Sequence, residues 1–149
     1  MSETVEFLSK TEYNTVGEML LNLIAECPCI PEGLTLQYQS LKVDESIGVF
    51  TLPGAKYLKK NVMGGFTAQI NFQVAYKSFP TTNGGRIESQ SIVDKIMDWL
   101  EKVDELPVLS GGRTITKITA SNSVAYTDTT GKDKSIAFAA DAVMEYEAE

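Results

Sequence analysis

A strand-like segment followed at once by a helix-like segment, within residues 68–102, most constrains how this chain folds. In the first part apolar and polar residues alternate: Ile70, Phe72, Val74 and Tyr76 take turns with Gln69, Asn71, Gln73 and Ala75. A period of two places one apolar row on one face of a strand. After a loop over 78–85, apolar residues recur at helical spacing: Ile92, Val93, Ile96, Trp99, Leu100 and Val103. We therefore expect a strand and a helix whose apolar rows pack on each other.

The rest of the chain predicts a second helix and further strands. The stripe Val16, Met19, Leu20, Leu23 and Ile24 predicts a helix over 12–26 that ends before Pro28. Strands are expected at 34–40, 47–52, 114–120 and 135–146, and 123–127 either extends the third of these or begins another. The alternation slips near Asp141 and Ala142, which predicts a β-bulge there.

Together these elements predict an α+β fold with a mixed, mainly antiparallel sheet and two helices packed on one face. Antiparallel hairpins leave the other sheet face to solvent or to a neighbour. With 149 residues the chain is most simply one domain, 1–149, in which residues 1–10 form a flexible arm and 11–149 the folded part.

The net charge of the chain indicates which kinds of molecule it can bind. The chain carries 20 acidic and 13 basic residues, a formal net charge of −7. Such a surface repels free nucleic acid and anionic membranes on average. Because the sequence shows neither a signal-peptide pattern nor an apolar run of roughly 20 residues, we expect a soluble protein made inside the cell, with no membrane partner.

The chain contains no histidine. This removes Ser-His-Asp and Cys-His nucleophilic systems and nearly all mixed nitrogen–sulfur zinc sites. A disulfide between Cys27 and Cys29, which only Pro28 separates, would be strained, and two cysteines are too few for a four-sulfur metal site. We expect two reduced thiols, no metal, no cofactor and no catalytic residue.

The glycine pairs and carboxylate pairs of the sequence do not predict an anion-binding or catalytic site. Only Gly84-Gly85, followed by Arg86, lies between a strand and a helix, where backbone amides can hold an anion. Permissive turn backbone explains these glycines equally well. The pair Asp44-Glu45 is expected at a turn, with both carboxylates in water.

Two polar segments are the candidates for contacts with other molecules. The densest basic cluster, within 55–65, contains Lys56, Tyr57, Lys59 and Lys60. It is either a solvated hairpin connection or a contact surface for an acidic partner or for passing DNA. The second segment, 128–133, is a hairpin turn by composition and contains Asp128, Lys132 and Asp133.

The order of these patterns resembles a known family. The segments that carry the resemblance are the first helix over 13–26, Ser46-Ile47-Gly48-Val49, the aromatic-rich strand 72–77, Arg86-Ile87-Glu88-Ser89, and the helical stripe 92–100. Over residues 13–146 the chain is similar to the small minor capsid proteins of long-tailed bacteriophages and related prophages, the group that includes tail terminators.

The resemblance implies a ring, commonly of six subunits, that caps the tail tube and joins it to the head. The expected partners are other copies of the chain, the tail tube protein and the head–tail connector, with DNA passing through the lumen without specific binding. It implies assembly in the bacterial cytoplasm and a place in the virion, and it brings no catalytic residues. Two alternatives remain: an adaptor that binds a protein through its exposed sheet face, and a small enzyme that uses Tyr, Asp, Glu or Lys in a cleft.

Overall fold

The computed structural model describes residues 12–13, 15–34, 36–42, 45–53, 57–60, 64–103, 106, 108–109, 113–127 and 135–148. Two helices and nine strands form within this part of the chain. In chain order they are β1 (Glu12–Tyr13), α1 (Val16–Ala25), β2 (Leu36–Tyr38), β3 (Ser46–Thr51), β4 (Tyr57–Lys60), β5 (Phe66–Ser78), α2 (Asn83–Lys102), β6 (Val108–Leu109), β7 (Arg113–Ala120), β8 (Val124–Thr127) and β9 (Ile136–Ala148).

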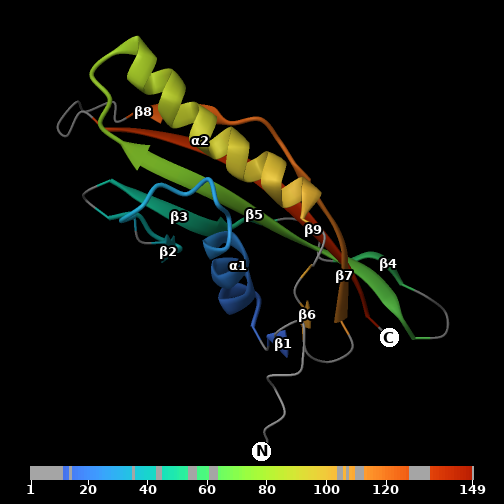
Figure 1. Ribbon diagram of the computed structural model, residues 1–149. Coiled ribbons are helices and arrows are strands. Elements are labelled where there is room, and N and C mark those ends of the chain that lie inside the picture. Colours follow the sequence, from blue (N-terminus) through green and yellow to red (C-terminus); the bar gives the residue numbers. More distant parts are fainter. Residues whose placement is uncertain are drawn as a thin grey trace, which may run out of the picture.

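All of these strands belong to one mixed sheet in the order β1-β6-β7-β9-β5-β3-β2, with β4 beside β5 and β8 beside β9. The β1–β6 and β2–β3 pairs are parallel and the others are antiparallel. The 13-residue strands β5 and β9 pair along their whole length and form the centre of the sheet (Figure 1). The predicted α+β class with a mainly antiparallel sheet is confirmed.

An interrupted strand lies along each side of this central pair. On one side, β3 and β4 pair with successive parts of β5. On the other side, β7 and β8 pair with successive parts of β9. The sequence left open whether 123–127 extends the preceding strand. The structure shows that β8 continues β7 along β9 after a three-residue break at 121–123.

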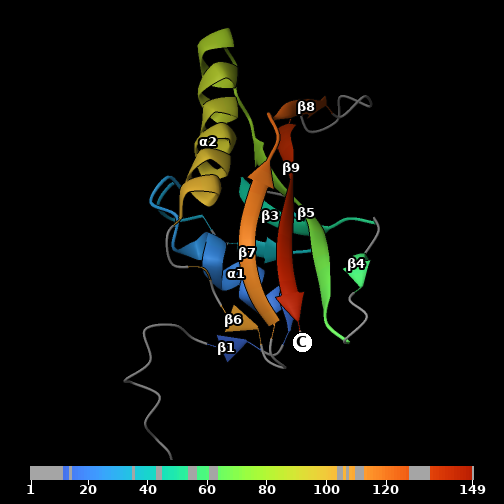
Figure 2. The same ribbon diagram turned by 90° about the vertical axis from the view of Figure 1, so that its right-hand side faces the viewer.

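Both helices cover the same face of the sheet, as predicted, and Figure 2 shows them on one side of the long strands. Their buried residues join those of the sheet in one core cluster. The helices contribute Met19, Leu20, Leu23, Ile24, Val93, Ile96, Met97 and Leu100, and the central strands contribute Phe72, Val74, Tyr76, Phe138, Ala140, Ala142, Met144 and Tyr146. The expected pairing of the second helix with β5 alone is too narrow, because α2 lies mainly over β7 and β9.

Capping side chains place both helix starts differently from the prediction. The Thr15 hydroxyl accepts a hydrogen bond from the Glu18 amide (3.3 Å), so α1 begins at Val16 and not at residue 12. Residues 12–13 instead form β1, which pairs with β6. At α2 the Thr82 hydroxyl accepts from the Gly85 amide (3.0 Å), so the glycine pair lies in the first helical turn and not in a loop.

The β-bulge predicted in β9 is wrong. The β5–β9 register is continuous, and the irregularity lies in β7, between Ile115 and Lys117. The prediction failed because Val143 is more hydrophobic than Ala142 and was assigned to the core. In the structure Ala142 is buried beneath the helices, whereas Val143 is half-buried on the other face. The small side chain occupies the core position, and the alternation continues without a slip.

Candidate interaction surfaces

The basic segment forms a strand where the sequence suggested a loop. Tyr57, Lys59 and Lys60 lie on β4, which pairs antiparallel with the first residues of β5. The expected loop is therefore wrong for residues 57–60, because β5 supplies them with backbone hydrogen-bond partners. Lys56 and residues 61–63 lie outside the described residues. The two lysines sit at one extreme end of the sheet.

The second candidate segment, with Asp128, Lys132 and Asp133, lies outside the described residues. Its flanking strands are described: β8 pairs antiparallel with β9, and Thr127 lies opposite Ile136. Ile136 in turn lies opposite Ser78, the last residue of β5, whereas β4 pairs with the first residues of β5. Only the strands that flank the second segment can therefore be compared with β4. β4 and β8 lie at opposite ends of the long central pair.

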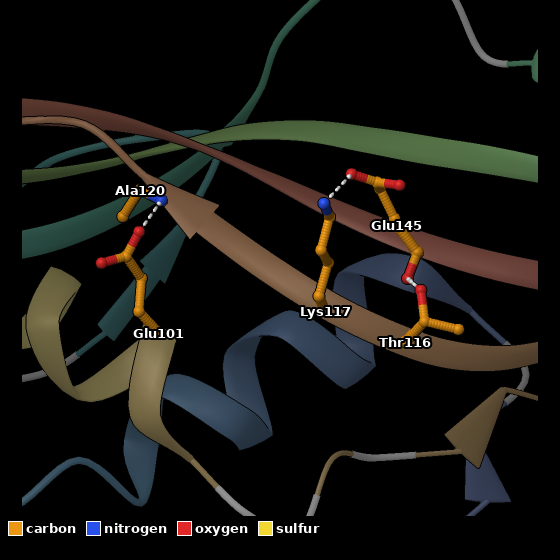
Figure 3. A network of polar contacts seen from close by, with 5 residues as sticks. All are labelled: Glu101, Thr116, Lys117, Ala120 and Glu145. Carbon is orange, nitrogen blue, oxygen red and sulfur yellow. Dashed lines mark hydrogen bonds and ion pairs between the residues drawn. The ribbon is translucent and has the colours of Figure 1, made fainter.

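On the sheet face away from the helices, polar side chains of neighbouring strands bond to one another. The Gln73 amide donates to an Asp141 carboxylate oxygen (3.0 Å), and Lys117 Nζ lies 3.4 Å from a Glu145 carboxylate oxygen. The Thr116 hydroxyl donates to the Glu145 carbonyl (3.2 Å), as Figure 3 shows. Lys117 and Glu145 thus pair opposite charges across neighbouring strands of this face.

One flank of α2 holds the break between β7 and β8. A Glu101 carboxylate oxygen accepts from the Ala120 amide (2.8 Å; Figure 3), and an Asp94 carboxylate oxygen accepts from the Ser123 amide (3.1 Å). The Gln90 side chain donates to the Ser123 carbonyl (3.3 Å). We did not predict these contacts from the sequence. The available signal was a polar stripe at 90, 94, 98 and 101 beside the apolar one.

Glu45 is another residue whose role the sequence did not predict. It was expected to point into water with Asp44, yet its carboxylate accepts a hydrogen bond from the Tyr76 hydroxyl. Burial of Tyr76, together with the bond to Glu45, raises the pKa of this phenol well above its usual range. The nearby Lys77 ammonium donates to the Lys42 carbonyl (3.3 Å). Lys42 and Glu45, two residues before β3, are therefore anchored to the end of β5.

The groups considered for nucleophilic or anion chemistry are engaged or buried. Burial raises the pKa of the Cys27 thiol to about 11, so the thiol is neutral at pH 7 and a poor nucleophile. Cys27 and Cys29 are both free thiols. The Gly85 amide is used by the Thr82 cap, and Arg86 donates to the Asn83 side chain (2.9 Å). Both groups of the possible anion site therefore take part in the helix's own first turn.

A cavity of about 250 Å³ lies between the start of α1 and the strands. Its lining consists of Val16, Thr51, Leu52, Gln69, Ile70, Asn71, Arg113 and Tyr146. These residues provide hydroxyl, amide and guanidinium groups but no carboxylate. The volume is just below the roughly 300–1,000 Å³ of most ligand sites. Elsewhere, no group of three or more His, Cys, Asp or Glu residues within the described ranges is placed to hold a metal ion.

Within the described part of the chain, neither helix is long and apolar enough to cross a membrane. A comparison with known protein families finds no match, and neither does a comparison with curated proteins.

Proposed function

We propose that this chain is a non-enzymatic structural protein of long-tailed phages, a tail terminator or neck component. In this role it forms a homo-oligomeric ring, a hexamer, that caps the tail tube and joins it to the head. The proposal rests on the resemblance of residues 13–146 to that group and on one observation from the structure, the distance between β4 and the strands that flank the second candidate segment.

That observation concerns the central strands. β4, with Lys59 and Lys60, pairs with the beginning of β5, while the 128–134 segment joins strands that pair beside the end of β5. Thirteen residues of strand at about 3.3 Å per residue separate these ends by roughly 40 Å. A rigid subunit with the basic strand β4 at one end and the β8–β9 pair at the other is suited to join two different partners. The tail tube protein and the head–tail connector are such partners.

The charges of the sheet are compatible with a DNA passage. Lysines on a lumen wall bind phosphates and hold DNA in place. On the helix-free face Lys117 is paired with Glu145, and the chain as a whole carries a net charge of −7. A wall of paired charges and amides, such as Gln73 with Asp141, lets DNA pass without specific binding.

The second candidate is an adaptor that binds a protein partner on the same helix-free face. The exposed polar groups of Gln73 and Asp141 on this face favour it, since a sheet face without helices is a surface on which another protein can pack. Oligomeric state separates the two candidates, because an adaptor does not need to form a ring.

Native mass spectrometry of the purified chain tests the ring. We expect a hexamer of about 98 kDa, six times the monomer mass of 16.3 kDa. A strict monomer would favour the adaptor. The virion role is tested separately, by labelling the chain with an antibody in particles of the phage or prophage that encodes it. Label at the junction of head and tail is expected, and particles without label would contradict the role.

A further inference from the structure

Two strands of the sheet leave one edge unpaired on opposite sides of the molecule. Among the described strands β2 pairs only with β3, and β8 pairs only with β9. Figure 1 shows β2 and β8 on opposite sides of the β5–β9 pair. An unpaired edge offers a row of backbone N–H and C=O groups to which a strand of another chain can bond.

These two edges lack the protection that the others have. Exposed edges are usually protected by a charged residue or a proline. β4 carries Lys59 and Lys60, β1 carries Glu12, and on β7 the Ala120 amide is bonded to Glu101. In contrast, β8 reads Val-Ala-Tyr-Thr and β2 reads Leu-Gln-Tyr. They also carry large exposed apolar side chains, Val124 at 53% and Tyr38 at 39%.

The two edges lie at the same level of the sheet. Gln37 of β2 lies opposite Gly48, which lies opposite Ala75 of β5. Ala75 lies opposite Ala139 of β9, and Ala139 lies opposite Val124 of β8. Gln37 and Val124 are therefore the two ends of one row of paired residues that runs across the sheet, one on each side of the molecule.

The strand directions match as well. β2 is parallel to β3, and the β3–β5, β5–β9 and β9–β8 pairs are antiparallel, so β8 runs opposite to β2. A second copy placed beside the first in the same orientation brings β8 against β2 as an antiparallel pair. Because the row is level, the contact needs no shift along the strands. A head-to-tail contact of this kind closes into a ring when the rotation from one subunit to the next closes, and it builds an open filament when it does not.

We infer that neighbouring copies of this chain join edge to edge, β8 of one copy pairing antiparallel with β2 of the next. Val124 then lies directly across from the neighbour's Gln37, and the sheet continues from subunit to subunit. This interface rests on the proposed ring, since it supplies the two different surfaces that a head-to-tail ring needs.

The two paired side chains project from the same face. Ile47 and Val49 are in the core beneath the helices, so Gly48 and its row partner Gln37 face the other way. Phe138 and Ala140 are likewise in the core, so Ala139 and its partner Val124 face away from the helices. Opposite charges at these positions attract across the new ladder, and like charges repel.

The test uses two double variants and a matched control, measured by native mass spectrometry and light scattering up to about 1 mM. At that concentration a contact with a millimolar dissociation constant is half occupied. V124K/Q37K places two lysines opposite each other and is expected to weaken assembly at least about tenfold. V124K/Q37E places a lysine opposite a glutamate and is expected to assemble like the wild type. The control V124K/T114K has the same net charge as the first variant, but Thr114 lies on β7, away from β2, so less loss is expected.

A second measurement does not depend on weakening the ring. V124C/Q37C, in a background with Cys29→Ser, is expected to form intermolecular disulfides under mild oxidation, seen as a ladder of cross-linked species. T114C/Q37C is the control and is expected to give no ladder. Thermal melts of each variant show that the monomer is folded.

The outcomes separate this inference from the proposed function. A ring that V124K/Q37K leaves intact, without cross-linking of V124C/Q37C, overturns the edge pairing while the ring remains. A ring that depends on both edges but is missing from virions supports the edge pairing and overturns the phage role. A wild-type chain that stays monomeric throughout the concentration range overturns the inference.

Discussion

Tyr76 is the residue at which the buried core of this protein meets a surface loop. Its side chain is 4% exposed, yet its hydroxyl reaches the Glu45 carboxylate outside the core. A hydrogen bond to a charged group contributes roughly 1.5–3 kcal/mol when it is well formed, and less when the carboxylate is exposed, as Glu45 is. The bond ties Glu45, the residue just before β3, to the end of β5.

We predict that Tyr76→Phe lowers the free energy of unfolding by about 1 kcal/mol at pH 7, since the bond to Glu45 is lost. The difference should shrink at high pH. Burial and Glu45 raise the pKa of Tyr76, so the folded state favours the neutral phenol. That contribution is complete below the unfolded pKa of about 10 and is lost as the pH rises above it. Urea melts of both proteins between pH 7 and 11 measure the difference, and a constant difference over this range would contradict the assignment.

Trp99 illustrates how the rim of the core differs from its centre. The helical stripe suggests that Trp99 is a core residue whose loss costs about 3–5 kcal/mol. In the structure it is half-buried and packs against the core from outside, whereas Phe72 is fully buried.

We therefore predict a larger loss for Phe72→Ala, about 3–5 kcal/mol, than for Trp99→Ala, about 2 kcal/mol. The smaller value follows because part of the indole already contacts water in the folded state. Urea denaturation of the two variants gives both values, with the circular dichroism of each confirming the fold. Equal losses would place Trp99 in the core or in a contact between subunits.

At the scale of elements, β9 shows that the strict alternation of side chains along a strand, and not their hydrophobicity, decides which residues face the core. Ala142 occupies a buried position under the helices, and Val143 occupies the half-buried position on the other face. We predict that Ala142→Leu destabilises the fold by about 1–3 kcal/mol through overpacking. Val143→Leu adds a single methylene on an open face and should change stability by less than about 0.5 kcal/mol. Chemical denaturation compares the two, and a larger loss for Val143→Leu would show that the predicted bulge exists in solution.

The elements that the sequence predicts well are those with long, regular patterns. β5 and the apolar stripe of α2 were predicted because thirteen- and twenty-residue elements repeat their period several times. The first helix was predicted to begin too early because its apolar stripe, which starts at Val16, does not by itself mark the Thr15 cap. The sequence predicts a loop at β4 because its four residues depend on pairing with β5, which no local pattern reveals.

The candidate surfaces were less predictable for a related reason. The bonds from Asp94 and Glu101 to the break after β7 join residues that lie 29 and 19 positions apart. Their polar character is visible in the sequence, but their partners are set by how α2 crosses the sheet. The same holds for Gln37 and Val124, whose shared row follows from pairing across β3, β5 and β9.

For the whole molecule, the central β5–β9 pair separates two candidate contact surfaces. The edges β2 and β8 lie on its two sides and are proposed to join neighbouring copies. The lysines of β4 lie at one end of it, where they can meet a different partner. A subunit built this way can lose contact with its partner and still form a ring.

This separation leads to a prediction for Lys56, Lys59 and Lys60 together. Replacing all three with Glu reverses the charge at the β4 end of the sheet, so contacts with an acidic partner surface become repulsive. We expect head–tail joining in infected cells to fall at least about tenfold, counted as free heads and tails by electron microscopy, while native mass spectrometry shows an unchanged ring. A control with Lys95→Glu and Lys102→Glu, on the exposed side of α2, should join normally. Unimpaired joining by the triple variant would remove the basic segment from the partner contact, and loss of the ring would place it between subunits instead.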